Sequence, residues 1–158
     1  MEIRNMIQTD IPQLAILYQQ FWNEPSDILA MQNQFDKLSK DERYILLSAV
    51  MDDKLVGSVM GIVCQELYGN CKPFLVLENM VVDQGTRRKG IGKSLLSRLE
   101  EIAKSRDCSQ IILVTELQRV DACLFYEACG FQTNNKGYKK KLKLDQFYGS
   151  HIHFLSVE

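Results

Sequence analysis

This chain of 158 residues has only three prolines, only two histidines and no marked excess of charge of either sign. Its 19 lysines and arginines are balanced by 20 aspartates and glutamates, which argues against a nucleic-acid partner because such proteins carry strongly basic surfaces. No apolar run reaches about 18 residues, so we expect no transmembrane helix and no membrane partner. The first residues also lack the charged and then apolar pattern of a secretion signal, and we therefore expect a cytoplasmic protein.

Cysteine motifs are absent as well. The five cysteines are an odd number and form no C-x-x-C pair, so neither a disulfide framework nor a zinc site is expected. The two histidines, His151 and His153, alternate near the end of the sequence. No further ligands accompany them there, and we expect no metal. We interpret the cysteines as reduced thiols that lie partly in the core.

The apolar pattern that is present predicts a layered fold. Apolar residues make up 46% of the chain and charged residues 25%, as in an average globular protein, and one domain over residues 1–158 is expected. Apolar spacing predicts helices from about residue 10 to 22, from 27 to 40, from 90 to 105 and from 121 to 129. Strands are predicted over residues 3–7, 44–50, 55–64, 74–82, 110–115, 137–144 and 147–157. This order predicts an α/β fold with a mixed sheet, built from hairpins in the first half and a crossover in the second.

The chemically informative stretch joins the strand that ends near Val82 to the helix that begins near Gly90. A helix start exposes about four unpaired N–H groups and a partial positive charge, and glycines allow close approach of the backbone. Four cations crowd the same turn, namely Arg87, Arg88, Lys89 and Lys93. Together these features predict an anion site, most naturally for a pyrophosphate.

Two common phosphate-binding motifs fail here on spacing. A Walker A loop that ends at Gly92-Lys93-Ser94 requires glycine at position 87, which is Arg87. A dinucleotide fingerprint that starts at Gly90 requires glycine or alanine at position 95, which is Leu95. From the loop alone, a solvated basic turn before an ordinary helix stays open as the alternative.

Two further runs combine with this loop into a recognisable pattern. The loop reads Arg-x-x-Gly-x-Gly, it follows the strand Leu-Glu-Asn-Met-Val-Val at residues 77–82, and Phe-Tyr-Glu-Ala-Cys-Gly-Phe occurs downstream at residues 125–131. In these motifs, their order and their separation, the chain resembles the GNAT superfamily of N-acetyltransferases over roughly residues 74 to 144. The resemblance implies a GNAT acyltransferase fold, with a mostly antiparallel sheet of six to seven strands flanked by about four helices. It also implies acetyl-CoA as co-substrate, without a metal.

Carried over residue by residue, the resemblance assigns the cofactor contacts. The pyrophosphate of acetyl-CoA would be held at Arg87, Arg88, Lys89, Gly90, Ile91, Gly92, Lys93 and Ser94. The pantetheine arm would pair with the free edge of the preceding strand at Met80, Val81 and Val82. The family often has asparagine seven residues before the motif tyrosine; this chain has Arg119 there, which could instead reach a phosphate.

The resemblance further implies direct transfer of the acetyl group to a primary amine. Tyr126 matches the family tyrosine near the cofactor sulfur and is the candidate general acid, with a half-buried structural tyrosine as the alternative. Glu78 is the candidate base, acting directly or through water, because a carboxylate within an apolar strand is costly to bury without a purpose. Burial would raise its pKa toward a useful value, whereas an ion-paired structural glutamate is the alternative. Asp83, just beyond the strand, reads as a turn residue.

The acceptor is less determined than the co-substrate. A small-molecule amine is the first expectation, and a protein lysine or N-terminus is the second. A non-catalytic acyl-CoA-binding sensor is the alternative from another class. Phe21, Trp22, Glu24 and Asp27 surround the break between the first two helices, where this family often builds acceptor specificity. We interpret the two aromatics as core residues, whereas the carboxylates could attract a cationic amine. A homodimer is possible through the strand-like tail over residues 145–158.

Overall fold

The computed structural model describes residues 1–140 and 142. The chain divides into two compact units, Met1–Glu116 and Leu117–Glu158, and each is described by itself. The second unit contains α4, Val120–Ala128, within its described residues. The first unit contains β1 Glu2–Asn5, α1 Ile11–Trp22, α2 Ile28–Leu38, β2 Tyr44–Met51, β3 Lys54–Cys64, β4 Phe74–Val82, α3 Ile91–Ser105 and β5 Ile111–Ile112, with short 3-10 turns η1 Gln8–Asp10 and η2 Gln84–Thr86.

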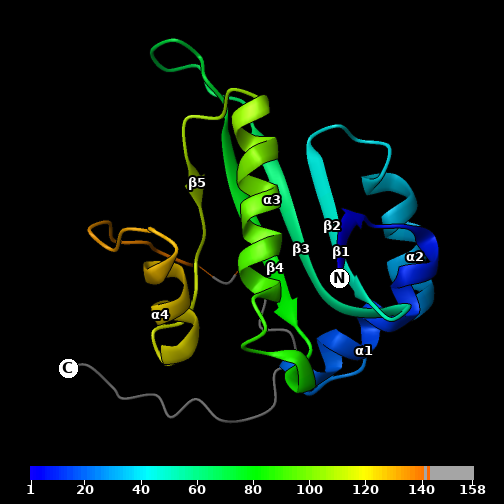
Figure 1. Cartoon of the computed structure of the whole chain (residues 1–158). Coiled ribbons are helices and arrows are strands. Elements are labelled where there is room, and N and C mark those ends of the chain that lie inside the picture. The colour runs from blue at the N-terminus through cyan, green and yellow to red at the C-terminus, as the bar shows by residue number, and fades with distance from the viewer. Residues whose placement is uncertain (141, 143–158) are drawn as a thin grey trace. The chain divides into compact units, whose positions relative to one another are not determined.

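The five strands form one sheet in the order β1-β2-β3-β4-β5, with antiparallel pairing everywhere except between β4 and β5, which are parallel (Figure 1). The expectation of an α/β fold with a mixed, mostly antiparallel sheet is confirmed, although the described residues supply five strands rather than six or seven. The expected strand over 137–144 is wrong over 137–140, which are irregular. The rest of that strand and the tail over 147–157 lie outside the described residues.

Helix α3 packs closely on one face of the sheet because two glycines on β3 make room for it. A Cβ atom built on Gly61 would lie 2.7 Å from Cδ1 of Leu99, and one on Gly57 would lie 3.1 Å from side-chain atoms of both Ile91 and Leu95. The helix presents a buried stripe at helical spacing, with Leu95 and Leu99 fully buried. The contact at Gly57 fixes the start of α3 relative to the first residues of β3 and the last residues of β4.

The opposite face of the sheet is covered by α1 and α2. Alternation along β3 places Ser58 on this face, next to Gly57 on the α3 face, and Ser58 pairs with Val81 of β4. Val81 belongs to the cluster that α1 buries, together with Met6, Ile11, Leu14, Leu17 and Leu55. The end of β4 therefore contributes to the α1 core, which ties that core to the segment that follows β4.

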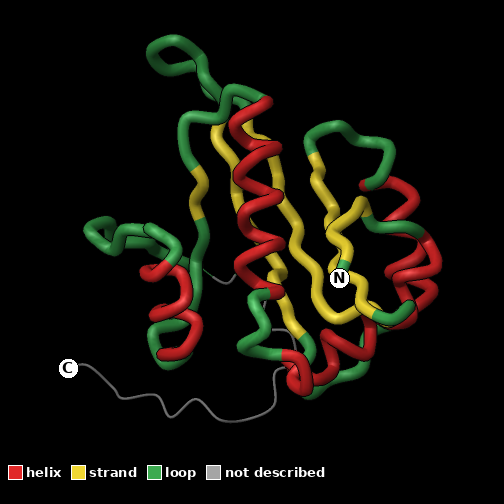
Figure 2. Tube along the Cα trace, in the orientation of Figure 1, coloured by secondary structure: helices red, strands yellow, loops and turns green. Residues whose placement is uncertain are grey.

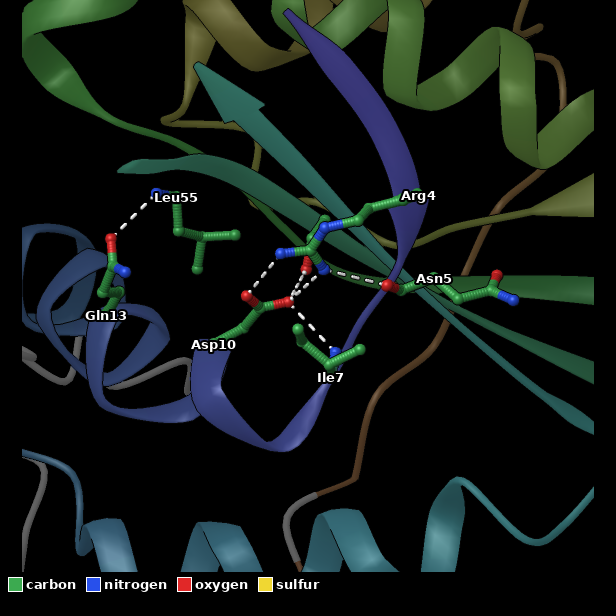
Figure 3. A network of polar contacts seen from close by, with 7 residues as sticks. Arg4, Asn5, Ile7, Asp10, Gln13 and Leu55 are labelled. Atoms are coloured by element: carbon green, nitrogen blue, oxygen red, sulfur yellow. Dashed lines mark hydrogen bonds and ion pairs between the residues drawn. The ribbon is translucent and has the colours of Figure 1, made fainter. Parts of the chain in front are cut away.

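A buried polar network joins β1 to the start of α1 (Figure 3). The Arg4 guanidinium donates to both carboxylate oxygens of Asp10 at 2.7 and 2.8 Å. The same carboxylate accepts from the backbone N–H of Ile7 at 3.0 Å and from the hydroxyl of Ser48 at 2.8 Å. Asp10 occupies the N-cap position of α1, but its side chain makes no capping hydrogen bond to that helix. It instead links β1, η1 and β2, and its carboxylate is almost fully buried.

The strand expected over 110–115 is shorter than predicted. β5 spans only Ile111–Ile112, paired with Leu75 and Val76, and the chain beyond it is drawn as loop in Figure 2. The sequence from 113 to 115 remains apolar or β-branched, so composition favours a strand there. A strand needs a partner, however, and the described residues provide no ladder for β5 beyond Ile112. The other helices and strands lie within about four residues of their predicted ends.

Candidate active site

The predicted anion loop lies at the end of β4 and leads directly into α3. Arg87, Arg88 and Lys89 are exposed, and Arg88 adopts a left-handed backbone with φ of 63°. Gly90 follows with φ of 80°, a conformation that an L-residue rarely adopts, and it occupies the N-cap position of α3. The loop thus turns sharply and presents three cations to solvent immediately before the helix.

The N-terminus of α3 has no side-chain cap among the described residues, and its first turn contains no acidic residue. Ile91 is buried against the sheet and fixes the helix start, whereas Gly92 and Ser94 are partly accessible and Lys93 is exposed. The N–H of Ser94 donates to the carbonyl oxygen of Gly90 at 2.9 Å, which leaves the N–H groups before it outside the helical ladder. This turn combines backbone donors, the helix dipole and cations, which suits a pyrophosphate.

A β-bulge interrupts β4 before this loop. Met60 pairs with Glu78 and Ser58 pairs with Val81, so β3 supplies only Val59 opposite both Asn79 and Met80. Asn79 has a positive φ of 51°, which accommodates the extra residue. The bulge therefore includes Met80, one of the three residues that the resemblance assigns to the pantetheine arm.

Glu78 is exposed, so the sequence argument that it lies buried within an apolar strand is wrong. The physical reason is its register: its partner Met60 lies two residues from Ser58, which places Glu78 on the face that α1 and α2 cover, beyond the buried cluster around Val81. The carboxylate is accessible to solvent there. It remains the candidate base by position, without the support of burial.

Beyond the bulge, β4 has an edge that β5 does not use. The β4–β5 ladder contains only the pairs of Leu75 and Val76, so β5 does not extend along β4 toward the anion loop. The predicted pantetheine contacts, Met80, Val81 and Val82, belong to this stretch. Val81 is 4% exposed and its side chain fills the α1 core, which leaves its backbone as the group that can contact a ligand.

Tyr126 and Arg119 belong to the second unit. Tyr126 is half-buried in α4, and its ring contacts those of Phe125 and Phe131 edge-on, with centroids 5.2 and 5.6 Å apart. Gly130, with φ of 90°, turns the chain after the helix, and the N–H of Phe131 donates to the carbonyl oxygen of Tyr126 at 3.1 Å. Arg119 occupies the N-cap position of α4. Their placement next to Glu78 and the loop, which lie in the first unit, stays a prediction.

Two of the residues around the break between α1 and α2 make contacts within the fold: Trp22 packs against other rings, and Asp27 caps a helix. Trp22 packs edge-on against Tyr18 and Phe21, with centroids 5.0 and 4.6 Å apart, and burial raises the pKa of Tyr18 to about 12. Asp27 caps α2, because its carboxylate accepts from the N–H of Ala30 at 2.9 Å. Asp27 therefore has a structural role.

The cysteines, the possible metal ligands and the helices of the described chain bear on other kinds of site. The five cysteines are free thiols; four are partly buried, Cys71 is exposed, and none belongs to the buried core. Burial raises the pKa of Cys108. Residues 1–140 and 142 contain no group of three or more side chains suited to hold a metal, and His151 and His153 lie outside them. None of the helices described here has both the length and the apolarity needed to span a bilayer.

Sequence reasoning missed two residues that the structure singles out. Gln20 on α1 hydrogen-bonds to the segment that leads into the loop, and nothing in a local pattern points to a partner more than 60 residues away. Thr115 follows β5, and its buried hydroxyl has no hydrogen-bond partner within the described part of the chain. Thr115 lies in an apolar run that predicts a strand, so only the structure shows that its hydroxyl is buried without a partner there.

Known proteins with similar sequences and folds agree with this geometry. Over 76 residues, 48% of this chain, it is 33% identical to the uncharacterized protein YdhI of Bacillus subtilis (strain 168). Over 91 residues, 58% of this chain, it is 33% identical to a streptothricin acetyltransferase of Escherichia coli. These matches cover 44% and 49% of the two relatives, so the chain spans about half the length of the curated relatives it matches.

The fold as a whole matches solved structures more completely. A transcriptional regulator from Bacillus halodurans C-125 superposes with a TM-score of 0.83 at 26% identity, over 89% of this chain and 99% of that one. Residues 11–131, about three quarters of the sequence, match the acetyltransferase (GNAT) family and include the loop, the bulged strand and the tyrosine motif. On this evidence the chain belongs to the GNAT acetyltransferase family.

Proposed function

We propose that this chain transfers the acetyl group of acetyl-CoA directly to the primary amine of a small molecule. One observation carries the proposal: an uncapped helix start, preceded by the cations of residues 87–89, lies at the end of a bulged strand that β5 pairs only at Leu75 and Val76. Coenzyme A contains a pyrophosphate and an extended, amide-containing arm. The helix start suits the pyrophosphate, and the strand edge suits the arm. The family match supports the same assignment.

The proposed chemistry needs a neutral amine. An alkyl ammonium has a pKa near ~10.4, so Glu78 would accept its proton, directly or through a water molecule. The amine nitrogen then forms a bond to the thioester carbon, and a backbone N–H near Met80 would stabilise the negative charge that develops on the carbonyl oxygen. The carbon–sulfur bond breaks, and Tyr126 would protonate the leaving thiolate. The nitrogen loses its second surplus proton as the intermediate collapses, and this proton would restore that of Tyr126 through solvent. The proton taken up by Glu78 is released to solvent. The products are the N-acetylated amine and free coenzyme A.

The acceptor class is proposed from the relatives and from the α1–α2 break. The E. coli relative is named for acetylating streptothricin, a small molecule. In this chain, Glu24 in the α1–α2 break is only partly exposed and is the remaining candidate to attract a cationic amine, because Asp27 is used as a cap. A protein lysine or N-terminus is the second candidate acceptor.

A calorimetric titration of the full chain with acetyl-CoA tests the proposal first. We expect micromolar binding. The same sample is then assayed for release of free thiol in the presence of small amines, amino sugars, polyamines and lysine peptides. Thiol release that depends on a small amine supports the proposal, and release only with peptides shifts it to a protein acceptor.

Binding without release from any of these amines contradicts the transferase. It would instead favour a non-catalytic acyl-CoA-binding sensor. Absence of binding would overturn the assignment of residues 87–94.

A further inference from the structure

The segment that leads from β4 into the anion loop is held by one side chain from a distant element. The side-chain amide of Gln20, near the end of α1, donates to Oδ1 of Asp83 at 3.0 Å. Its Oε1 accepts from the backbone N–H of Gln84 at 3.2 Å. The side chain of Gln84 returns a bond to the carbonyl oxygen of Gln20 at 3.0 Å. Three hydrogen bonds thus join the end of α1 to the start of η2.

Other bonds to this segment come from its own neighbourhood or from backbone. The N–H of Asp83 donates to the carbonyl oxygen of Val56 at 2.9 Å, and Thr86 donates to the carbonyl of Asp83 through both its N–H and its hydroxyl. Within the described residues, Gln20 is the one side chain from another helix or strand that hydrogen-bonds to residues 83–86. Its amide uses both a donor and an acceptor, which fixes orientation as well as distance.

These contacts lie at the side of the loop that α3 does not fix. The C-terminal side of the loop is held by Ile91, which is 2% exposed. On the N-terminal side, residues 87–89 are exposed and follow η2 directly. We infer that Gln20 is a positioning residue for cofactor binding: its amide holds η2 so that the loop presents its cations and N–H groups in the arrangement that binds pyrophosphate. This inference rests on the proposed function.

The first test compares two adjacent glutamines on the same helix. Gln20→Ala removes the amide, and Gln19→Ala makes the same change at an exposed residue that has no side-chain hydrogen bond in the described part of the chain. Two solvent-exposed hydrogen bonds are lost in the first variant, and we expect its dissociation constant for acetyl-CoA to rise about five- to tenfold. Gln19→Ala should stay within about twofold of wild type. At saturating acetyl-CoA, kcat should be unchanged in both variants, because Gln20 does not touch the reacting atoms.

A polarity swap distinguishes positioning from a general loss of structure. Gln20→Glu keeps the acceptor for Gln84 but places a carboxylate against that of Asp83, and it should weaken binding at pH 7. Adding Asp83→Asn supplies a side-chain amide at position 83 that can donate to the new carboxylate at position 20. This bond reverses the donor and the acceptor of the wild-type pair. Affinity in the double variant should return to that of Asp83→Asn alone, which is the correct reference because removing a carboxylate near an anion site changes affinity by itself.

Each outcome has a separate meaning. If wild type binds acetyl-CoA and Gln20→Ala binds it equally well, the positioning role is overturned and the proposed function stands. The role is equally overturned if the double variant stays as weak as Gln20→Glu. If wild type does not bind acetyl-CoA, the proposed function fails first. Amide hydrogen exchange of residues 84–90 gives an independent readout, since faster exchange is expected in Gln20→Ala but not in Gln19→Ala.

Discussion

The carboxylate of Asp10 should contribute more to stability than any other ion-pair partner in the described chain. It accepts four hydrogen bonds, two from Arg4 and one each from Ile7 and Ser48, and its side chain is only 6% exposed. Asp10→Ala removes all four bonds and leaves a guanidinium and a buried hydroxyl without this partner. Removing one member of a buried pair costs about 3–5 kcal/mol. The Arg4 side chain is 26% exposed and can still reach water, so we expect the lower end, about 3 kcal/mol.

Urea unfolding, followed by circular dichroism, measures this loss directly. For a protein of this size, about 3 kcal/mol also lowers Tm by roughly 6–12 °C. Asp36→Ala is the matched control, because Asp36 pairs with Lys40 at 3.2 Å but both side chains are mostly exposed. The control should cost less than about 1 kcal/mol. A loss below about 1 kcal/mol in Asp10→Ala would refute the reasoning that the network is a buried, mutually satisfied unit.

The same network predicts how stability depends on pH. Burial alone would raise the pKa of Asp10, but the hydrogen bonds from Arg4, Ile7 and Ser48 outweigh it and hold that pKa below its usual value. A depressed pKa stabilises the fold above the unfolded-state value of about 3.9 and stops doing so as the pH falls through the folded-state value. The stability difference between wild type and Asp10→Asn should therefore be constant from pH 7 to about pH 5 and shrink below about pH 4. A difference that grows with acid would contradict this sign.

Three further predictions concern the proposed reaction. Gly92→Trp places a large side chain over the uncapped N–H groups of α3 and should abolish acetyl-CoA binding in calorimetry, so wild-type affinity would remove the loop assignment. Tyr126→Phe should lower turnover about 10²-fold or more with acetyl-CoA affinity within about twofold, and normal turnover would end its assignment as the acid. Glu78→Gln should cut activity at pH 7 about 10²-fold and recover part of it near pH 10, where the amine is already neutral; a wild-type pH profile would place the base elsewhere.

The parts of the site that sequence predicted are those with strong local signals. The end of β4 follows from an apolar run that stops near Val82. The start of α3 follows from the glycine at position 90, whose positive φ only a few residue types tolerate. The cations of the loop are visible in the sequence itself. Their accessibility follows from the sharp turn that brings the chain into α3.

The parts that sequence missed depend on pairing between distant segments. Glu78 was expected to be buried because its neighbours are apolar, but its exposure is set by register with β3 and by how far α1 covers that face. Asp10 has a partner, Ser48, that lies 38 residues away in sequence, and Gln20 has partners 63 and 64 residues away. A polar residue outside a motif gives no local indication of such contacts, so these roles require the three-dimensional structure.

The bulge in β4 also makes the number of residues in this strand a determinant of the site. With Asn79 and Met80 opposite one residue of β3, Val81 faces the α1 core. Deleting Asn79 would leave Met80 alone opposite Val59 and restore simple alternation, with Val81 still facing the α1 core and Val82 still on the α3 face. The anion loop would therefore start from the same side of the strand. The deletion would remove the irregular backbone where the resemblance places the pantetheine arm and keep the core in place, whereas a substitution at Asn79 keeps the bulge.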